Sequence, residues 1–402
     1  MQKNLRKAIL VCAGCTLMLL VTGGLAVNVF SAAQPYILAQ YGFSNTQTSL
    51  IITIRSGVYL LCMLVVTQYY RLVGYRFGCA SSCILAGVSF AMFASAKTLP
   101  AFYAAGAVAG LCYGLGSMVP ASILISRWFR AHRGLALGAC AAGTGLATVV
   151  FSPILTRLIE ARGLSEAFWW TAAFCALCGV AAFFLVRDTP ERCGLEPFGE
   201  CVQETPQAHA LHEIRPSRFR WAMLVLAVML LCGITSTGFT HMMTLYMTQG
   251  MDAVRTALAL SVSGLSLMAG KCACGELCDL LGSRRANVLM FGILIAGCTL
   301  CALAPGKNVV VMFLAAGLFG FGASINSVGV SIWAADFSSP ASYGKLLQLF
   351  QAAFGLGNIL LSFVPGAVAD LTGGYAPAYA VFAVLLVFCL AVLQSTYRLA
   401  EK

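Results

Sequence analysis

The sequence contains few charged residues. They make up 10% of the 402 residues, and the whole chain has 14 acidic residues and 4 histidines. An average soluble domain is roughly 25% charged. The sequence also offers no nucleophile–base pairing, no phosphate-binding loop and no cluster of metal-ligand side chains. These absences argue against a soluble domain, against an enzyme, and against a bound metal or other cofactor.

What the sequence does contain is long apolar runs. Hydrophobic residues make up 60% of the chain. A helix needs about 20 consecutive apolar residues to cross a bilayer, and lipid admits only helices or closed barrels. Twelve stretches meet this length: 8–38, 46–69, 78–97, 100–126, 134–158, 166–186, 220–248, 254–277, 286–305, 308–335, 346–370 and 376–397. We therefore predict an all-α membrane protein with twelve transmembrane helices.

Two short turns recur in both halves of the chain. Gly42 and Gly250 are separated by the same number of residues as Gly74 and Gly282. A spacing that is kept through two membrane spans indicates a duplicated six-helix bundle. Many secondary transporters are built from such repeats and bind their substrate between them. The fold expected is therefore two pseudo-symmetric six-helix bundles.

One extended polar stretch divides the two halves. Residues 187–219 contain four of the 12 prolines and six of the 14 acidic residues. A segment of this composition and length is typical of a loosely ordered linker rather than a domain. We predict an N-terminal bundle at 1–186, a cytoplasmic linker at 187–219 and a C-terminal bundle at 220–402.

The basic residues predict the orientation. One side of the membrane receives only Lys97, Arg157, Arg162, Arg255 and Lys307, whereas 18 of the other 20 lysines and arginines fall on the side of the termini. The positive-inside rule then puts both termini in the cytoplasm of a cell whose inner (plasma) membrane holds the protein. The net charge of +11 follows from this topology and does not require nucleic acid.

Two other features have competing interpretations. Lys3, Arg6 and Lys7 before an apolar run resemble a signal peptide, but the run is longer than a typical signal-peptide core, which favours retention as a span. The 18 cysteines include Cys-x-x-Cys pairs inside apolar helices. Because no histidine or carboxylate cluster accompanies them, packing is favoured over metal or redox chemistry.

The segment 275–285 resembles the signature that the major facilitator superfamily carries between spans eight and nine. A glycine there permits close helix contact, an acid caps and pairs, and arginines anchor the turn. The first-half copy differs, since Arg71 stands where Asp279 is expected and Thr67 where Gly275 is expected. The resemblance implies gating roles for Gly275, Asp279, Gly282, Arg284 and Arg285, and for Arg71, Gly74 and Arg76 in the first half.

A second motif narrows the resemblance. The stretch from Arg127 through Arg133 to Gly138 is similar to the turn between spans four and five in the oxalate/formate antiporter and monocarboxylate porter branch. The resemblance adds Arg127 and Arg133 to the gating set. It also implies a substrate-carboxylate ligand at Lys271, where the branch usually has arginine. The span-eleven region around Gln351 is uncharged, so a monoanion is favoured over a dianion.

Two cations remain inside the predicted spans. Arg55 follows the turn at Ser44 by eleven residues, about 16 Å along a helix, and Lys271 lies in span eight. Arg55 could instead cap backbone carbonyls, and Lys271 could reach towards the cytoplasm. All 14 acidic residues can be placed in loops or at span ends, with Asp336 and Asp370 the nearest to the interior. Because an unpaired buried cation is costly, a substrate anion would complete the site.

Several polar side chains are candidates for lining the site. His241 is the intramembrane group expected to titrate near neutral pH, although a lone histidine more often makes a helix contact. Tyrosine and amide groups supply directional donors in an apolar pocket. The remaining candidates are Asn28, Gln34, Tyr59, Tyr113, Tyr246, Asn326 and Gln351.

The sequence therefore predicts a secondary active transporter of a small organic anion, best described as a monocarboxylate, that works by alternating access. Antiport and proton-linked transport both stay open. The expected partners are the substrate anion, the lipid bilayer, and a coupling proton or counter-anion, with the chain acting as a monomer. One alternative is a multidrug-type exporter of amphipathic compounds. Another is a non-transporting membrane sensor derived from a carrier.

Overall fold

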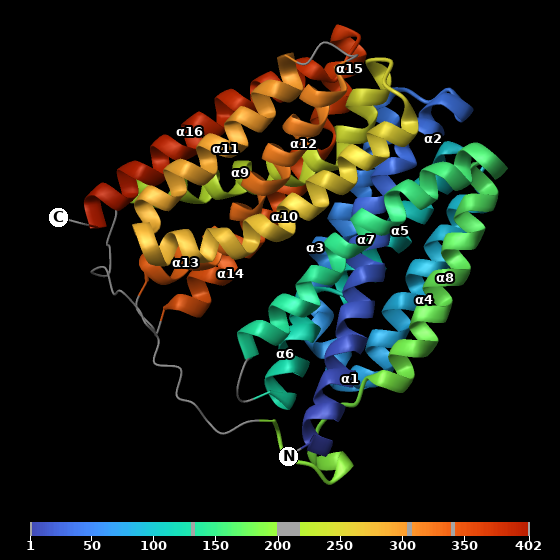
Figure 1. Ribbon diagram of the computed structural model, residues 1–402, viewed down its shortest axis with the longest axis vertical. Helices are drawn as coiled ribbons and strands as arrows, with labels where there is room; N and C mark the ends of the chain where they lie inside the picture. The colour runs from blue at the N-terminus through green and yellow to red at the C-terminus, as the bar shows by residue number, and fades with distance from the viewer. Residues whose placement is uncertain (1, 130–132, 199–217, 304–307, 339–341, 401–402) are drawn as a thin grey trace. The chain divides into compact units, whose positions relative to one another are not determined.

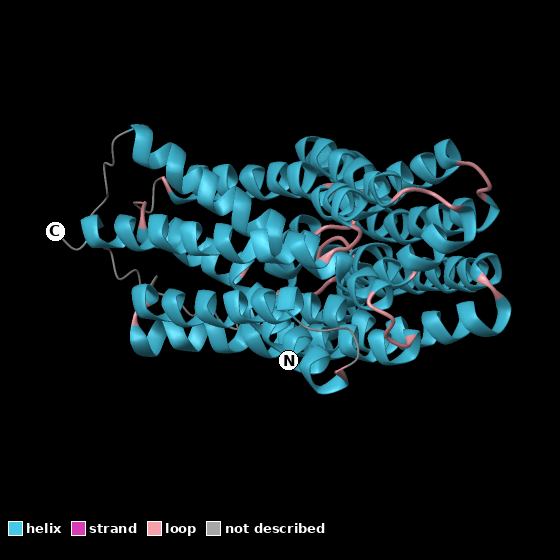
Figure 2. Ribbon diagram, turned by 90° about the horizontal axis from the view of Figure 1, so that it is seen from above, coloured by secondary structure: helices cyan, strands magenta, loops and turns pink. Residues whose placement is uncertain are grey.

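The chain folds into helices joined by short loops (Figure 2). The structure is a computed structural model that describes residues 2–129, 133–198, 218–303, 308–338 and 342–400. Within these ranges, twelve helical segments are long and apolar enough to cross a membrane. The predicted all-α fold with twelve transmembrane spans is confirmed.

The chain forms two compact units. Unit 1 comprises Met1–Phe43 and Ile54–Thr205, and unit 2 comprises Ser44–Thr53 and Pro206–Lys402. Helix α3 therefore begins in unit 2 and continues in unit 1. Figure 1 labels the helices along the chain.

Unit 1 contains six spans, two of which are divided into shorter helical segments. Its α-helices pack mainly as α4 against α8 and α5, and α1 against α7 and α8. The helices are α1 (Gln2–Leu19), the π-helix η1 (Leu20–Asn28), the 3-10 helix η2 (Val29–Ala32), α2 (Gln34–Tyr41), α3 (Asn45–Val73), α4 (Tyr75–Ser95), α5 (Leu99–Leu115), α6 (Met118–Trp128), α7 (Arg133–Arg162), α8 (Leu164–Leu185) and the 3-10 helix η3 (Glu191–Cys193).

Unit 2 also contains six spans, but its first one is a single helix. In this unit α9 packs against α14 and α16, α12 packs against α10 and α11, and α11 packs against α16. The helices are α9 (Arg218–Thr248), α10 (Ala253–Leu281), α11 (Ser283–Leu303), α12 (Val309–Ala323), the 3-10 helix η4 (Ser324–Asn326), α13 (Val328–Asp336), α14 (Tyr343–Ser362), α15 (Val364–Thr372) and α16 (Ala376–Ala400).

The duplicated turns have the same backbone geometry. Gly74 and Gly282 have φ angles of 83° and 77°, and Gly42 and Gly250 have φ angles of 65° and 83°. A positive φ strains a residue that has a Cβ, so glycine is the natural residue at all four turns. The sequence repeat therefore reflects four turns at which the chain reverses direction between spans.

The interrupted spans break at small or cyclic residues. Between α5 and α6 the chain passes through Gly116 and Ser117, and between α14 and α15 it passes through Phe363, with Pro365 in the first turn of α15. Proline is tolerated in a first helical turn because the N–H groups there have no intrahelical partner. Each break therefore divides one predicted span into two shorter helices.

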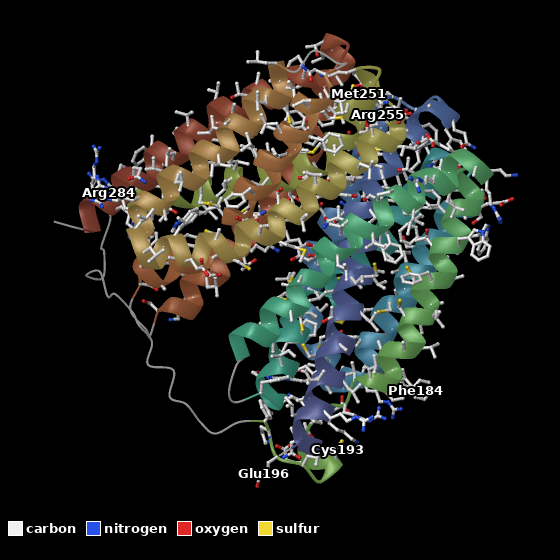
Figure 3. All side chains as sticks on the ribbon, viewed as in Figure 1. Phe184, Cys193, Glu196, Met251, Arg255 and Arg284 are labelled. Atoms are coloured by element: carbon white, nitrogen blue, oxygen red, sulfur yellow. The ribbon has the colours of Figure 1, made fainter. Side chains whose placement is uncertain are left out.

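The first part of the predicted linker is attached to unit 1. The amide of Phe198 donates to the carbonyl of Trp128 at 2.8 Å, and the Trp128 indole donates to the Arg187 carbonyl at 3.0 Å. The rest of the predicted linker, residues 199–217, lies outside the described residues. Figure 3 labels Cys193 and Glu196 in the attached part.

Candidate functional site

The guanidinium of Arg55 is buried inside unit 1. Its side chain is 5% exposed, and Nη1 donates to the carbonyl of Ala26 at 3.0 Å. Ala26 belongs to the π-helix η1, a wide helical turn that is often found at functional sites. In the described part of the chain, the ionisable groups beside Arg55 are Tyr113 and Cys112, and no carboxylate is among them.

Two tyrosines stack beside this cation. Tyr59 lies one helical turn after Arg55 on α3, and its ring stacks on the ring of Tyr113 from α5, with centroids 4.4 Å apart and planes at 21°. Gly110 allows this arrangement, because a Cβ there would overlap the Arg55 carbonyl oxygen. The close approach of α3 and α5 therefore brings Arg55, Tyr59 and Tyr113 together, as three of the predicted site residues.

The two other unit 1 candidates lie at the two ends of the segment that follows the π-helix. Asn28 is half-buried at the end of η1, and its carbonyl accepts from the Ser31 hydroxyl at 2.5 Å. Gln34 is fully buried at the first residue of α2. Their predicted roles in substrate binding stay proposals.

The break between α5 and α6 is closed by side chains from neighbouring helices. The Tyr70 hydroxyl donates to the Leu115 carbonyl at 3.0 Å, and the Thr22 hydroxyl donates to the Gly116 carbonyl at 2.7 Å. Thr22 lies on η1, so the π-helix and the break contact each other directly. Ser117, the residue before α6, is 5% exposed and its hydroxyl has no partner among the described residues. Sequence reasoning missed this polar group.

Lys271 is half-buried in the second half of α10. The residue before it, Gly270, lies against the Phe321 carbonyl of α12, which sets how closely the two helices approach. No described carboxylate forms an ion pair with Lys271. Among the described residues Lys271 is therefore without a carboxylate partner, although it is less buried than Arg55.

His241 lies in a fully buried part of α9. Its Nε2 is 3.0 Å from the Ser362 carbonyl oxygen of α14, and its ring stacks on Tyr375 with centroids 5.6 Å apart. These contacts match the helix-contact interpretation of a lone histidine. They also connect His241 to the loop between α15 and α16, which contains Tyr375.

The remaining unit 2 candidates have different surroundings. Tyr246 is 1% exposed and its hydroxyl lies 3.3 Å from Cys301 Sγ and 3.5 Å from the Met312 carbonyl, so it is packed between helices. Asn326 is half-buried and donates to the Thr235 hydroxyl at 2.9 Å. Gln351 is exposed on α14.

One buried amide was missed by the sequence analysis. Asn358 on α14 is 6% exposed, and its Oδ1 has no hydrogen-bond partner among the described residues. It lies one helical turn before Ser362, which contacts His241. The apolar run 346–370 contains three amides, of which Gln351 was among the predicted site residues. Nothing in the local sequence distinguishes Asn358 from Gln348 and Gln351.

The first-half signature turn has a carboxylate partner from another helix. Asp188, just after α8, accepts from the amides of Tyr75 and Arg76 through Oδ1, at 2.6 and 3.0 Å. These are first-turn amides of α4, which have no intrahelical partner. Arg76 in turn donates from Nε to the Phe183 carbonyl at 2.8 Å. The acid missing at Arg71, which is exposed, is thus replaced at this turn by Asp188.

The second-half turn uses an amide instead. Arg284 Nε donates to Gln394 Oε1 at 3.2 Å, and Gln394 Nε2 donates to the Arg284 carbonyl at 2.9 Å. Figure 3 shows Arg284 at one end of unit 2, with Met251 and Arg255 at the other. A Cβ at Gly275 would meet no described atom within 4 Å, so the close helix contact expected there stays a prediction.

The other gating candidates are only partly described. Arg127 is exposed and its guanidinium lies over the Tyr75 ring, 4.6 Å from the centroid, while Arg285 is exposed. The side chains of Asp279 and Arg133 lie outside the described residues. No group of three or more potential metal ligands is present in the described ranges.

Comparison with known proteins identifies the family. The model of the Major Facilitator Superfamily matches residues 16–306 and 259–401. The Escherichia coli MFS-type transporter YhjX is 26% identical over 69% of this chain and 68% of its own length. The oxalate:formate antiporter of Oxalobacter formigenes is 33% identical, over 26% of this chain and 24% of the antiporter. Monocarboxylate transporter 13 of Bos taurus is 26% identical over 73% of this chain and 67% of its own length.

Solved structures show the same fold. The nucleoside transporter NupG superposes with a TM-score of 0.75 at 13% identity, covering 97% of this chain and 99% of that one. The D-xylose-proton symporter superposes with a TM-score of 0.68 at 18% identity, covering 96% of both chains. The predicted superfamily, and the likeness to oxalate/formate and monocarboxylate carriers, are confirmed at this low identity.

Proposed function

The chain belongs to the Major Facilitator Superfamily of transporters, and on that premise we propose that it carries a small organic anion, in particular a monocarboxylate. The observation that carries this proposal is Arg55, a buried cation with no carboxylate beside it in the described residues. A buried charge without a partner is costly, and one that attracts its substrate gains a partner whenever the substrate binds.

The surroundings of Arg55 support an anion rather than a cation as the substrate. A guanidinium presents five N–H donors in a planar fork that fits a carboxylate. One of these donors is used by Ala26, and two stacked tyrosines lie next to the cation. A lipophilic cation would instead require a buried carboxylate. The two acids nearest the interior, Asp336 and Asp370, bond to Tyr397, Asn45 and Thr46.

We further propose that Lys271, His241, Asn326 and the buried Asn358 contribute the unit 2 part of the binding site. Lys271 would supply a second positive charge, and the amides would supply directional hydrogen bonds. The monocarboxylate transporters and the oxalate:formate antiporter among the relatives support a carboxylate over a sugar or nucleoside.

The orientation and the coupling belong to the same proposal. The distribution of lysine and arginine favours an inner-membrane protein with both termini in the cytoplasm, which makes the turns at Gly42 and Gly250 extracellular. In the proposed cycle, the substrate is bound alternately from the two sides, by anion exchange or together with a proton. The monomer is the expected functional form.

The test is uptake into proteoliposomes of labelled formate, acetate, lactate and pyruvate, with oxalate as the dianion for comparison. Replacing Arg55→Gln removes the charge but keeps a hydrogen-bonding group. A hydrogen bond to a charged group is worth about 1.5–3 kcal/mol, so uptake at low substrate concentration should fall by roughly 10- to 150-fold. The matched control is Lys97→Gln, which removes an exposed charge between α4 and α5 and should leave uptake unchanged.

Three results would overturn the proposal. Uptake that is equal in the Arg55→Gln variant and the wild type would remove Arg55 from the site. Transport of lipophilic cations without any carboxylate uptake would favour the multidrug-type alternative. Stabilisation by a carboxylate without flux would favour the sensor alternative.

A further inference from the structure

The first segment of helix α3 is bound within unit 2. Residues Ser44–Thr53 group with unit 2, whereas the same helix from Ile54 onward belongs to unit 1. The helix itself is continuous from Asn45 to Val73 (Figure 1). Its residues 45, 49 and 53 share one face, because positions four apart lie above one another on a helix. This face is the one that unit 2 contacts.

Asp370 holds the start of this face. Its Oδ1 accepts from the Asn45 amide at 3.0 Å and from Asn45 Nδ2 at 2.8 Å, and its Oδ2 accepts from the Thr46 amide at 2.9 Å and the Thr46 hydroxyl at 2.6 Å. The first amides of a helix lack intrahelical partners and carry partial positive charge. A carboxylate that pairs with them makes charge-assisted bonds. Asp370 therefore caps α3 from a different part of the chain.

Two further contacts, at Gly366 and Ser362, continue this surface along the helix. Gly366, one turn before Asp370, lies so close to α3 that a Cβ would overlap Ser49 Oγ and the Asn45 carbonyl. One turn earlier again, the Ser362 hydroxyl is 2.7 Å from the Thr53 hydroxyl. Small and polar residues on the facing surfaces permit this close approach. The contact surface is thus polar and narrow rather than apolar.

Tyr375 links this surface to the buried histidine. Its hydroxyl donates to Asn45 Oδ1 at 3.0 Å, and its ring stacks on His241. Burial raises the pKa of the Tyr375 hydroxyl, so it remains a hydrogen-bond donor at neutral pH. His241 also contacts the carbonyl of Ser362, the residue whose hydroxyl contacts Thr53. His241 therefore contacts residues at both ends of the surface: Tyr375 beside Asn45, and Ser362 beside Thr53.

Arg55 lies on the same helix as this contact surface, so a movement of the first turns of α3 also affects Arg55. Arg55 follows Thr53 by two residues on the same helix. A motion between the two units must therefore either release the first turns of α3 from unit 2 or bend the helix. A bend would fall at the Ser56–Gly57 pair, since a Cβ at Gly57 would meet no described atom within 4 Å.

We propose that Asp370 and the first turn of α3 form a releasable extracellular latch, which holds residues 44–53 on unit 2 and opens when the transporter changes conformation. The holding part of this proposal stands on the observed contacts alone, whereas the opening part rests on the proposed transport function. Asp370 is exposed and Asn45 and Thr46 are half-buried, so water can replace the bonds when they break.

The first experiment measures hydrogen–deuterium exchange of full-length protein in lipid nanodiscs. Asp370→Asn keeps the shape but removes the charge, and we expect exchange of the amides in 44–53 to accelerate at least tenfold. The matched control is Asp252→Asn, because Asp252 caps α10 by accepting from the Arg255 amide at 3.2 Å. This control should accelerate exchange at the start of α10 and leave 44–53 unchanged. Equal exchange of 44–53 in wild type and Asp370→Asn overturns the latch.

The second experiment tests opening. The pair Thr53→Cys with Ser362→Cys places two thiols where two hydroxyls touch, and oxidation of the pair should stop lactate uptake until a reductant is added. The single variants, which keep all native cysteines, control for oxidation elsewhere. Full uptake by the cross-linked protein overturns the opening step, as does a tenfold loss of uptake in Gly57→Ala, which would indicate a bend. A wild type that does not transport lactate contradicts the proposed substrate class but leaves the exchange result intact.

Discussion

The two repeats agree at their turns and differ in their first spans. Gly74 and Gly282, at equivalent positions, have φ angles within a few degrees of each other. In contrast, the first span of unit 1 is interrupted by the π-helix η1, whereas the first span of unit 2 is the single helix α9. The two repeats therefore share the backbone conformation of their glycine turns but differ in the helical structure of their first spans.

The difference coincides with a difference in buried charge. The π-helix of unit 1 presents a carbonyl to Arg55, and its glycine Gly24 lies against Ala147 of α7. The regular helix α9 presents His241 and Thr235, which are neutral hydrogen-bonding groups with partners on α14 and near η4. A buried guanidinium needs hydrogen-bond acceptors, and in a regular helix the backbone carbonyls already accept bonds from the helix itself. The irregular first span of unit 1 therefore supplies the backbone acceptor that the buried Arg55 needs.

Removing one residue from each first span gives the largest expected contrast. Deleting Val27 lets η1 relax towards an α-helix, so the protein should still fold, but the residues on one side of the deletion turn by about 100° and anion uptake should be lost. Deleting the equivalent Thr235 from α9 has no wide turn to absorb it. This variant should not give a folded, monodisperse peak in size-exclusion chromatography, and equal yields of both variants would contradict the contrast.

Close helix contacts in the two units should respond alike. A Cβ at Gly110 would overlap the Arg55 carbonyl, and a Cβ at Gly357 would overlap the Met229 carbonyl. Because backbone cannot move aside easily, Gly110→Ala and Gly357→Ala should each lower the free energy of unfolding by about 1–3 kcal/mol. Gly57→Ala, in open space, should raise it by about 0.5–1 kcal/mol. Thermal unfolding in detergent measures all three, and a neutral Gly110→Ala would disprove the tight contact.

The signature turns should differ in their response to salt. Asp188→Ala removes a charged cap from α4 and should cost about 1–2 kcal/mol at low salt, with a smaller cost at 1 M salt. Gln394→Ala removes two neutral-acceptor bonds to Arg284 and should cost about 1 kcal/mol at any salt concentration. Melting temperatures in low and high salt distinguish the two. The same salt dependence for both variants would mean that the turns are held in the same way.

The smallest expected effects come from removing the hydroxyl of one tyrosine in each unit, Tyr113 in unit 1 and Tyr246 in unit 2. Tyr246→Phe removes a hydroxyl that contacts Met312 and Cys301, so the free energy of unfolding should fall by about 1 kcal/mol with uptake unchanged. Tyr113→Phe should change stability by less than about 0.5 kcal/mol but alter the apparent affinity for the substrate. Affinity changes in Tyr246→Phe alone would reverse the assignment.

The fold could be predicted from the sequence because lipid leaves few options. Runs of apolar residues longer than the bilayer thickness must be helical, and the glycine spacing revealed the duplication. The breaks within the spans were not predicted. The π-helix at 20–28 contains no proline, and an extra residue in a helical turn leaves no compositional mark. Likewise, the grouping of residues 44–53 with unit 2 depends on tertiary contacts that no local pattern encodes.

For the candidate site, the sequence indicated which side chains are charged or polar. Arg55 was proposed because an arginine in an apolar run is unusual, and the two tyrosines next to it were proposed for their polarity. The tyrosine Tyr246 has the same polarity but lies in helix packing, since sequence position does not reveal which way a helix face turns. Asp188 was overlooked as the acid of the first-half turn, because it lies far along the chain from Arg71.

A break in a membrane helix ordinarily draws in water, because its carbonyl groups need partners. At the break between α5 and α6, Tyr70 and Thr22 supply those partners from within unit 1. Two hydroxyl groups thus satisfy the carbonyls that would otherwise recruit a file of solvent molecules. Unit 1 can therefore contain an interrupted span in which these two carbonyls need no water as a hydrogen-bond partner.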